Sequence, residues 1–197
     1  GNSKDILNLC YAMVILDVAV TYEHDFLKLW SMALNLDPDT LSPKASTQLF
    51  QVFAFAQASG LDIAEPKVSF ANVLPTITSK AQSEASLLLN ELGFHHDEEV
   101  SPFLDGQRAG APGMLAIDMA CRDKKIAIEF DGPKHYLIDA HSGEVSQVEN
   151  GATKAKRRFL EQLGWTVFNI RYFDWMKAEG KDGKHDMLRE MLGQHLQ

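Results

Sequence analysis

The stretch KIAIEFDGPKHY, residues 125–136, decides the fold of this protein. Its first seven residues, 125–131, are largely apolar, which predicts a strand in the centre of a sheet. The Gly-Pro pair at 132–133 ends that strand, because proline cannot donate a hydrogen bond to a sheet. Alternate residues of a strand share a face, so Glu129 and Asp131 are predicted to point the same way near its end.

A second strand is predicted immediately before this one. Residues 115–121 are apolar except for Asp118, and the polar residues 122–124 form a tight turn that makes the two strands neighbours. Pairing about this turn brings Asp118 close to Glu129 and Asp131. The sequence therefore predicts three carboxylates at the ends of two adjacent strands.

Carboxylates held this close repel one another unless a cation or a proton lies between them. Carboxylate oxygens are ligands for Mg²⁺ or Mn²⁺, and such an ion can activate water against a phosphodiester. His135 would lie at the mouth of the same site, as a general acid or base or as a phosphate contact. Lys154 and Arg157 could offset charge in the transition state. In the alternative interpretation the carboxylates are solvated or paired with lysines, and His135 is an ordinary surface residue.

The other elements of the C-terminal half follow from changes in the period of apolar residues. We predict a helix at 79–92, a short strand within 94–103, a loop at 138–151, a helix at 153–163, a strand at 165–170 and a final helix at about 182–196. A hairpin followed by a crossover helix and a last strand predicts an α/β fold, with a mixed β-sheet flanked by helices.

The first sixty residues show helical spacing, with predicted helices at 6–16, 26–33 and 43–58. Two interpretations stay open for them, the end of an α-helical repeat array and a plain three-helix packing element. Proline residues and the absence of periodicity predict a linker at 62–78. The predicted organisation is thus a helical repeat-like segment at 1–61, a linker at 62–78 and an α/β domain at 79–197.

Composition limits the classes of function. The 197 residues carry a net charge of −8 with a pI near 5.3, which argues against binding of nucleic acid through the overall charge of the protein. No apolar run is long enough for a membrane helix, and no cysteine spacing indicates structural zinc. We expect a fragment or a processed form, because the sequence runs at once into a helical pattern. One local basic patch is present: Lys154, Lys156, Arg157 and Arg158.

Three motifs in order resemble the RAP domain, named as an RNA-binding domain abundant in apicomplexans. They are IAIEFDGPKHY at 126–136, TKAKRRFLEQLGWTV at 153–167 and YFDW at 172–175. In the family pattern, a strand ends in Glu-x-Asp-Gly-Pro-x-His and is followed by a helix rich in Lys and Arg that ends in Leu-Gly-aromatic. A further strand and an aromatic-x-x-Trp motif come last. The resemblance covers residues 117–196.

This resemblance implies a place at the C-terminus of a protein with upstream helical repeats, in a mitochondrion or alternatively a chloroplast. It implies a role in organellar RNA processing, rRNA stability, translation or mitoribosome assembly, with RNA and ribosomal or other ribonucleoprotein proteins as partners. The residues expected to contact RNA are Lys134, His135, Tyr136, Lys154, Lys156, Arg157 and Arg158. Aromatic residues could also stack on unpaired bases, namely Tyr136, Trp165, Tyr172, Phe173 and Trp175.

The RAP domain is itself similar to the very short patch repair endonucleases, within the PD-(D/E)XK nuclease class. This implies a restriction-endonuclease-like sheet in which Asp118 matches the first acidic residue, Glu129 the second, and His135 the histidine after the Gly turn. The sequence departs from the standard motif at Asp131, where a lysine is expected. A lysine supplied by the following helix could replace it, with Lys154 or Arg157 as candidates.

Three functions therefore stay open. The first is an RNA-binding protein that uses a nuclease-like scaffold. The second is a metal-dependent endoribonuclease with Asp118, Glu129 and Asp131 as ligands and His135 in proton transfer. The third is a non-catalytic module whose acidic surface binds basic proteins. The departure at Asp131 favours binding over catalysis.

Overall fold

The computed structural model describes residues 3–68, 78–103 and 115–196. Its first part is a group of helices: α1 (Ser3–Ile15), α2 (Glu23–Ala33), the 3-10 turn η1 (Pro38–Thr40) and α3 (Pro43–Ala58). The start of α3 follows from its sequence, because Pro43 occupies the first turn and the Ser42 side chain accepts a hydrogen bond from the Ala45 N–H at 3.3 Å. All three predicted N-terminal helices are confirmed.

The first part of the predicted linker packs against these helices. Residues 62–68 have no regular secondary structure, and Ile63 is buried. The indole Nε1 of Trp30 donates a hydrogen bond to the carbonyl oxygen of Ala64 at 3.1 Å. Residues 69–77 lie outside the described ranges.

The central sheet is mixed, as predicted. Its strands lie in the order β1 (Asp97–Val100), β2 (Ile117–Cys121), β3 (Ile126–Asp131) and β6 (Thr166–Arg171). The first two pairings are antiparallel, and β3 pairs with β6 in parallel through the crossover helix α5 (Gly151–Gln162). Every residue of β3 is buried, which confirms its central place.

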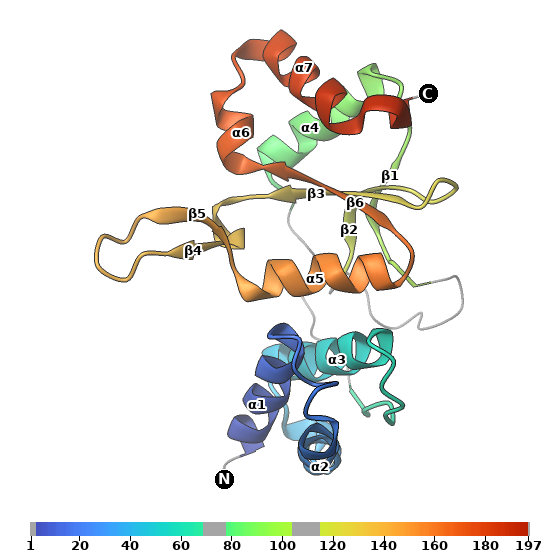
Figure 1. Cartoon of the computed structure of the whole chain (residues 1–197), viewed down its shortest axis with the longest axis vertical. Coiled ribbons are helices and arrows are strands. Elements are labelled where there is room, and N and C mark those ends of the chain that lie inside the picture. Colours follow the sequence, from blue (N-terminus) through green and yellow to red (C-terminus); the bar gives the residue numbers. More distant parts are fainter. Residues whose placement is uncertain (1–2, 69–77, 104–114, 197) are drawn as a thin grey trace.

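Helices cover both faces of this sheet (Figure 1). One face carries α4 (Lys80–Glu91), α6 (Tyr172–Lys177) and α7 (Gly180–Leu192), and the 3-10 turn η3 (Gly193–Leu196) follows α7. The other face carries α5, and α1 to α3 lie beyond it. The sequence did not predict the six-residue helix α6. It placed the final helix at 182–196, whereas α7 begins at Gly180 and gives way to η3 at Gly193, whose φ is +49°.

The predicted loop at 138–151 is wrong. A second, two-stranded antiparallel sheet forms here from β4 (Tyr136–Ile138) and β5 (Val145–Glu149), and it projects from the body (Figure 1). Its turn is built by Asp139, whose carboxylate accepts hydrogen bonds from the backbone N–H groups of His141 and Ser142, both at 2.8 Å. The arm buries little apolar surface, so its sequence lacks the alternation of apolar and polar residues that indicates a strand.

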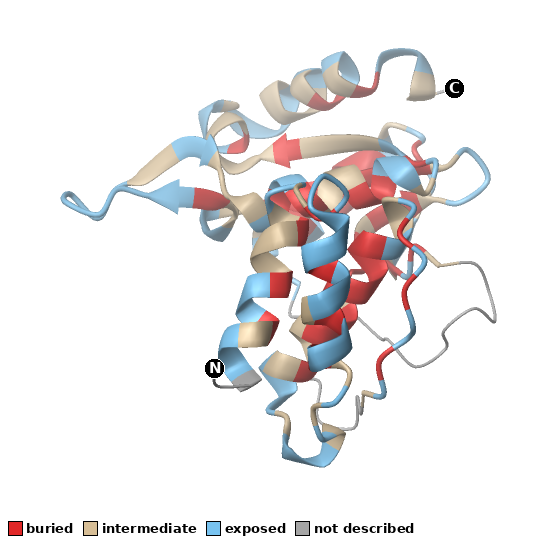
Figure 2. Cartoon of the chain, turned by 60° about the horizontal axis from the view of Figure 1, so that its bottom comes forward, coloured by how far each residue is buried: buried red, intermediate tan, exposed pale blue. Residues whose placement is uncertain are grey.

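Two hydrophobic cores lie on opposite faces of the sheet. The first joins residues of α1, α2 and α3 to Phe159 and Leu160 of α5 and to Ala127 of β3. The second lies under α4, α6 and α7 and contains Ile128 and Trp175. Figure 2 shows that the buried segments gather in the middle of the molecule, whereas the β4–β5 arm is mostly exposed or half-buried. The N-terminal helices therefore share a core with the helix that crosses over the sheet.

None of the described helices combines the length and apolar character needed to cross a membrane.

Gly151 gives a direct test of this shared packing. A Cβ added at Gly151 would lie 2.6 Å from Cγ2 of Ile15, at the end of α1. We expect Gly151→Ala to lower the free energy of unfolding by about 1–3 kcal/mol, because α1 must shift from α5. The matched change Gly183→Ala in α7 meets its nearest atom at 3.4 Å and should instead stabilise the chain by about 0.5–1 kcal/mol. Urea unfolding measures both, and equal effects would show that α1 does not press on α5.

Candidate functional site

The three predicted carboxylates do meet. Glu129 and Asp131 end β3 on the face that α5 covers, and they are 4% and 1% exposed. Asp118 of β2 reaches the same place, because its Oδ2 accepts a hydrogen bond from the backbone N–H of Phe130 at 2.8 Å. Burial raises the pKa of Asp118 above its usual value, although Lys156 and the Phe130 N–H oppose this.

A lysine from α5 lies against this group, and it is Lys156 rather than Lys154 or Arg157. Its Nζ lies 2.5 Å from Oε2 of Glu129 and donates to the carbonyl oxygen of Ala116 at 2.6 Å. Burial raises the pKa of Glu129 to about 7, and the nearby Asp118 adds to this while Lys156 opposes it. Burial lowers the pKa of Lys156, but the charge of Glu129 and Asp118 more than offsets this, so that pKa lies above its usual value.

His135 lies at the mouth of the site, as predicted. The Gly132-Pro133 break turns the chain into the 3-10 turn η2 (Pro133–His135), and Nδ1 of His135 then lies 3.0 Å from Oδ1 of Asp131. This hydrogen bond raises the pKa of His135, although partial burial opposes the effect. A protonated His135 would carry positive charge at the opening of the site.

Asn169 was not singled out from the sequence, yet it joins the two halves of the site. It lies on β6 opposite Glu129, and its Nδ2 donates to Oδ2 of Asp131 at 2.7 Å. Its Oδ1 accepts a hydrogen bond from Nε of Arg157 at 3.0 Å, and Arg157 also pairs with Glu149 of the β4–β5 arm. A lone amide in the mostly apolar stretch 165–170 was the available signal, but its register with β3 depended on the sheet order.

The start of α5 fixes η2 in place. Asn150 caps the helix, because its Oδ1 accepts a hydrogen bond from the Thr153 N–H at 3.0 Å, and its Nδ2 donates to the Lys134 carbonyl oxygen at 2.8 Å. The Thr153 hydroxyl lies within 3.3 Å of Nδ1 and 3.2 Å of the carbonyl oxygen of His135. The cap residues therefore set the position of the histidine.

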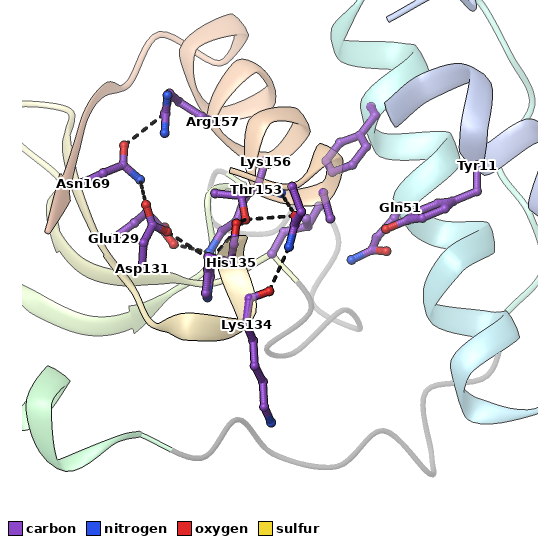
Figure 3. A pocket seen from close by; sticks show the side chains of 14 residues that line it. Tyr11, Gln51, Glu129, Asp131, Lys134, His135, Thr153, Lys156, Arg157 and Asn169 are labelled. Carbon is purple, nitrogen blue, oxygen red and sulfur yellow. Dashed lines mark hydrogen bonds and ion pairs between the residues drawn. The ribbon is translucent and has the colours of Figure 1, made fainter. Parts of the chain in front are cut away.

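These residues line a cavity of about 210 Å³ that the N-terminal helices help to close (Figure 3). Tyr11 of α1 and Gln51 of α3 lie across the opening from His135 and Thr153. Phe55 of α3 supplies an apolar part of the wall. The cavity thus lies between the helical segment and the sheet domain.

The remaining predicted RNA contacts have different surroundings. Lys134 and Lys154 are exposed. Arg158 points to the end of α1, where it donates to the Val14 carbonyl oxygen at 2.6 Å and pairs with Asp17 at 3.1 Å. Of the aromatic candidates, three are buried and two are half-buried: the buried ones are Tyr136, Trp165 and Trp175, and the half-buried ones are Tyr172 and Phe173. Their contact with RNA stays a prediction.

The predicted metal site can be tested against the donor atoms. Within residues 3–68, 78–103 and 115–196, no three His, Cys, Asp or Glu side chains converge closely enough to hold a metal ion. Lys156 provides the positive charge beside Glu129, and both oxygens of Asp131 accept hydrogen bonds from His135 and Asn169. Binding of Mg²⁺ or Mn²⁺ therefore stays a prediction, on which only the second candidate function below depends.

Comparisons with known proteins address the same region. The family model of the RAP domain matches residues 128–191, which run from β3 into α7 and include Asp131, His135, Lys156 and Asn169. A rice protein (Oryza sativa subsp. japonica) named "RAP domain-containing protein, chloroplastic" is 28% identical over 117 residues. That match covers 59% of this chain but only 16% of the rice protein. Residues 128–191, with the acidic strand end and the capped basic helix, thus match the family model of the RAP domain, and the rice relative is named for the same domain.

Proposed function

We propose that this chain binds RNA at the cavity beside η2 and α5. The RAP domain is associated with RNA binding, which supports a general RNA-binding role. The observation that carries the proposal is the local charge of the cavity. Three lysine or arginine residues, Lys134, Lys156 and Arg157, line it together with His135 and with the acidic residues Glu129 and Asp131.

Two of these basic residues are already paired, Lys156 with Glu129 and Arg157 with Glu149. Lys134 stands out among the lining cations, because it is exposed and no ion pair of its side chain is found in the described part of the chain. An exposed ammonium group beside a cavity is suited to a phosphate. His135 adds charge beside it whenever the imidazole is protonated.

Lys134→Glu tests this function. We expect the substitution to weaken binding of a labelled single-stranded RNA several-fold and to reduce the salt dependence, by about 0.7 in the slope of log K against log salt for one lost phosphate contact. Fluorescence anisotropy across a salt series measures both quantities. Lys28→Glu makes the same charge change on an exposed residue of α2 and should have little effect. Equal losses in the two variants would contradict a specific role for Lys134.

The finer proposal is that the full-length protein acts in an organelle, in RNA processing, rRNA stability or assembly of the organellar ribosome. The rice relative is named chloroplastic, which supports an organelle without separating mitochondrion from chloroplast. We place the protein in a mitochondrion, with ribosomal or other ribonucleoprotein proteins as partners. Fractionation of cells that express the full-length protein, followed by sequencing of the RNA it retains, tests this assignment.

A second candidate is an endoribonuclease that uses Asp118, Glu129 and Asp131. One observation favours it: Nζ of Lys156 contacts Glu129 from α5, so a lysine does lie beside the acidic group although Asp131 occupies its usual place in the sequence. The proposal keeps His135 as the candidate for proton transfer.

Cleavage of a structured RNA tests the second candidate. With Mg²⁺ or Mn²⁺ added, this candidate requires the wild-type chain to cut the RNA, and the Asp118→Asn plus Glu129→Gln variant to cut it roughly 100-fold more slowly or worse. These substitutions keep the size of both side chains, so the fold should survive. Equal rates for the two proteins, or no cleavage by either, would remove this candidate and leave the binding function in place.

A further inference from the structure

We propose that the cavity is a composite site for one unpaired RNA nucleotide, whose base stacks on Tyr11 of the N-terminal helices. The inference rests on the proposed RNA-binding function and names the part of the RNA that enters the cavity. It also assigns a recognition role to α1 and α3, which lie outside the residues matched by the RAP domain model.

The two walls of the cavity differ in chemistry. The wall built from η2 and α5 carries Lys134 and His135, which suit a phosphate. The wall built from α1 and α3 carries the ring of Tyr11 and the amide of Gln51 (Figure 3). A nucleotide combines an anionic phosphate with a flat base that can stack on an aromatic ring and hydrogen-bond to an amide. The composite cavity therefore matches both halves of a nucleotide.

The size of the cavity restricts the ligand. Its volume is about 210 Å³, which is below the roughly 300–1,000 Å³ of pockets that enclose drug-sized ligands. Such a space takes one base, with its phosphate at the opening, rather than a folded stretch of RNA. A base inside a duplex is stacked on its neighbours and paired, so only an unpaired nucleotide can enter.

The tyrosine wall is held in a fixed position relative to the RAP domain. Phe55 of α3 packs on Phe159 of α5, with ring centroids 5.2 Å apart. Arg158 ties α5 to the end of α1 through the Val14 carbonyl oxygen and Asp17. Tyr11 lies on this same helix α1, and its side chain is half-buried. A preformed wall lowers the entropic cost of ordering the site on binding.

The experiment compares tyrosine variants on single-stranded RNA that carries the fluorescent adenine analogue 2-aminopurine. Stacking on Tyr11 should quench this analogue when the wild-type chain binds. Tyr11→Leu should weaken binding roughly 5- to 150-fold and abolish the quench, whereas Tyr11→Phe, which keeps the ring, should retain both. Tyr22→Leu removes a tyrosine that is 57% exposed and should leave binding unchanged. The same RNA annealed into a duplex should bind more weakly than the single strand.

Gln51→Glu protects the test against a folding defect, because it preserves side-chain size. It adds a negative charge to the α3 wall, so it should weaken binding if a nucleotide occupies the cavity. If Tyr11→Leu and Gln51→Glu bind like wild type, if Tyr22→Leu weakens binding as much as Tyr11→Leu, or if no quench occurs, the inference is overturned even though RNA binding stands. The function itself fails separately, if wild type binds no RNA or if Lys134→Glu behaves like Lys28→Glu.

Discussion

Lys156→Met is expected to lower the free energy of unfolding by about 3 kcal/mol at neutral pH. The methionine keeps most of the aliphatic stem but removes the ammonium group that lies 2.5 Å from Glu129. Glu129 is then left buried beside Asp118 with no cation next to it, which costs more than the ion pair contributes. Urea unfolding at pH 7 measures the loss.

A matched control lies two residues earlier on the same helix. Lys154 is exposed, so Lys154→Met should change the free energy of unfolding by no more than about 0.5 kcal/mol. Combining Lys156→Met with Glu129→Gln removes both charges and should restore at least half of the lost stability. If the single and double variants unfold alike, the lysine acts through its packing rather than through its charge.

Stability is expected to fall between about pH 4.5 and pH 7, and Glu129→Gln should remove most of that slope. Burial raises the pKa of Glu129 from 4.5 to about 7, so the folded state keeps a proton that the unfolded state releases. The stability from this group is fully present below pH 4.5 and is lost as the pH rises through about 7. This pKa shift corresponds to a change in the free energy of unfolding on the order of 3 kcal/mol across that pH range.

Thermal and urea unfolding at a series of pH values check the effect. The pKa of His135 is also raised above 6.5. Its contribution to the free energy of unfolding is therefore lost as the pH rises through the folded-state pKa, in the same direction as the contribution of Glu129. Glu129→Gln keeps a neutral side chain at all pH values and isolates the glutamate. Glu161→Gln makes the same change at an exposed position of α5 and should leave the wild-type slope. A Glu129→Gln profile that follows wild type would contradict the raised pKa.

Elements with a strong local signal could be predicted from the sequence. The apolar run at 125–131 gave the central strand, and the Ser42-Pro43 pair gave the start of α3. The β4–β5 arm was missed because it buries little and carries polar residues, so no core face appears in its sequence. The helix α6 was missed because six residues are too few to show a helical period.

The candidate site was predicted where its members are close in sequence. Asp118, Glu129 and Asp131 meet because one tight turn joins β2 and β3, and His135 follows directly after the strand. The residues that come from elsewhere were missed. Asn169 reaches Asp131 only because β6 pairs in parallel with β3, and Tyr11 reaches the cavity only because α1 packs on α5.

The sequence by itself determined that a basic helix follows the acidic strand end, but only the tertiary structure decided which lysine meets Glu129. Ala155 and Phe159 turn one face of α5 into the core. Each residue advances an α-helix by about 100°, so Lys154 and Lys156 flank Ala155 symmetrically on either side of that face. Helical periodicity alone therefore does not distinguish which of the two lysines faces Glu129. The packing of α5 between the sheet and the N-terminal helices turns Lys156 toward the carboxylates and leaves Lys154 exposed.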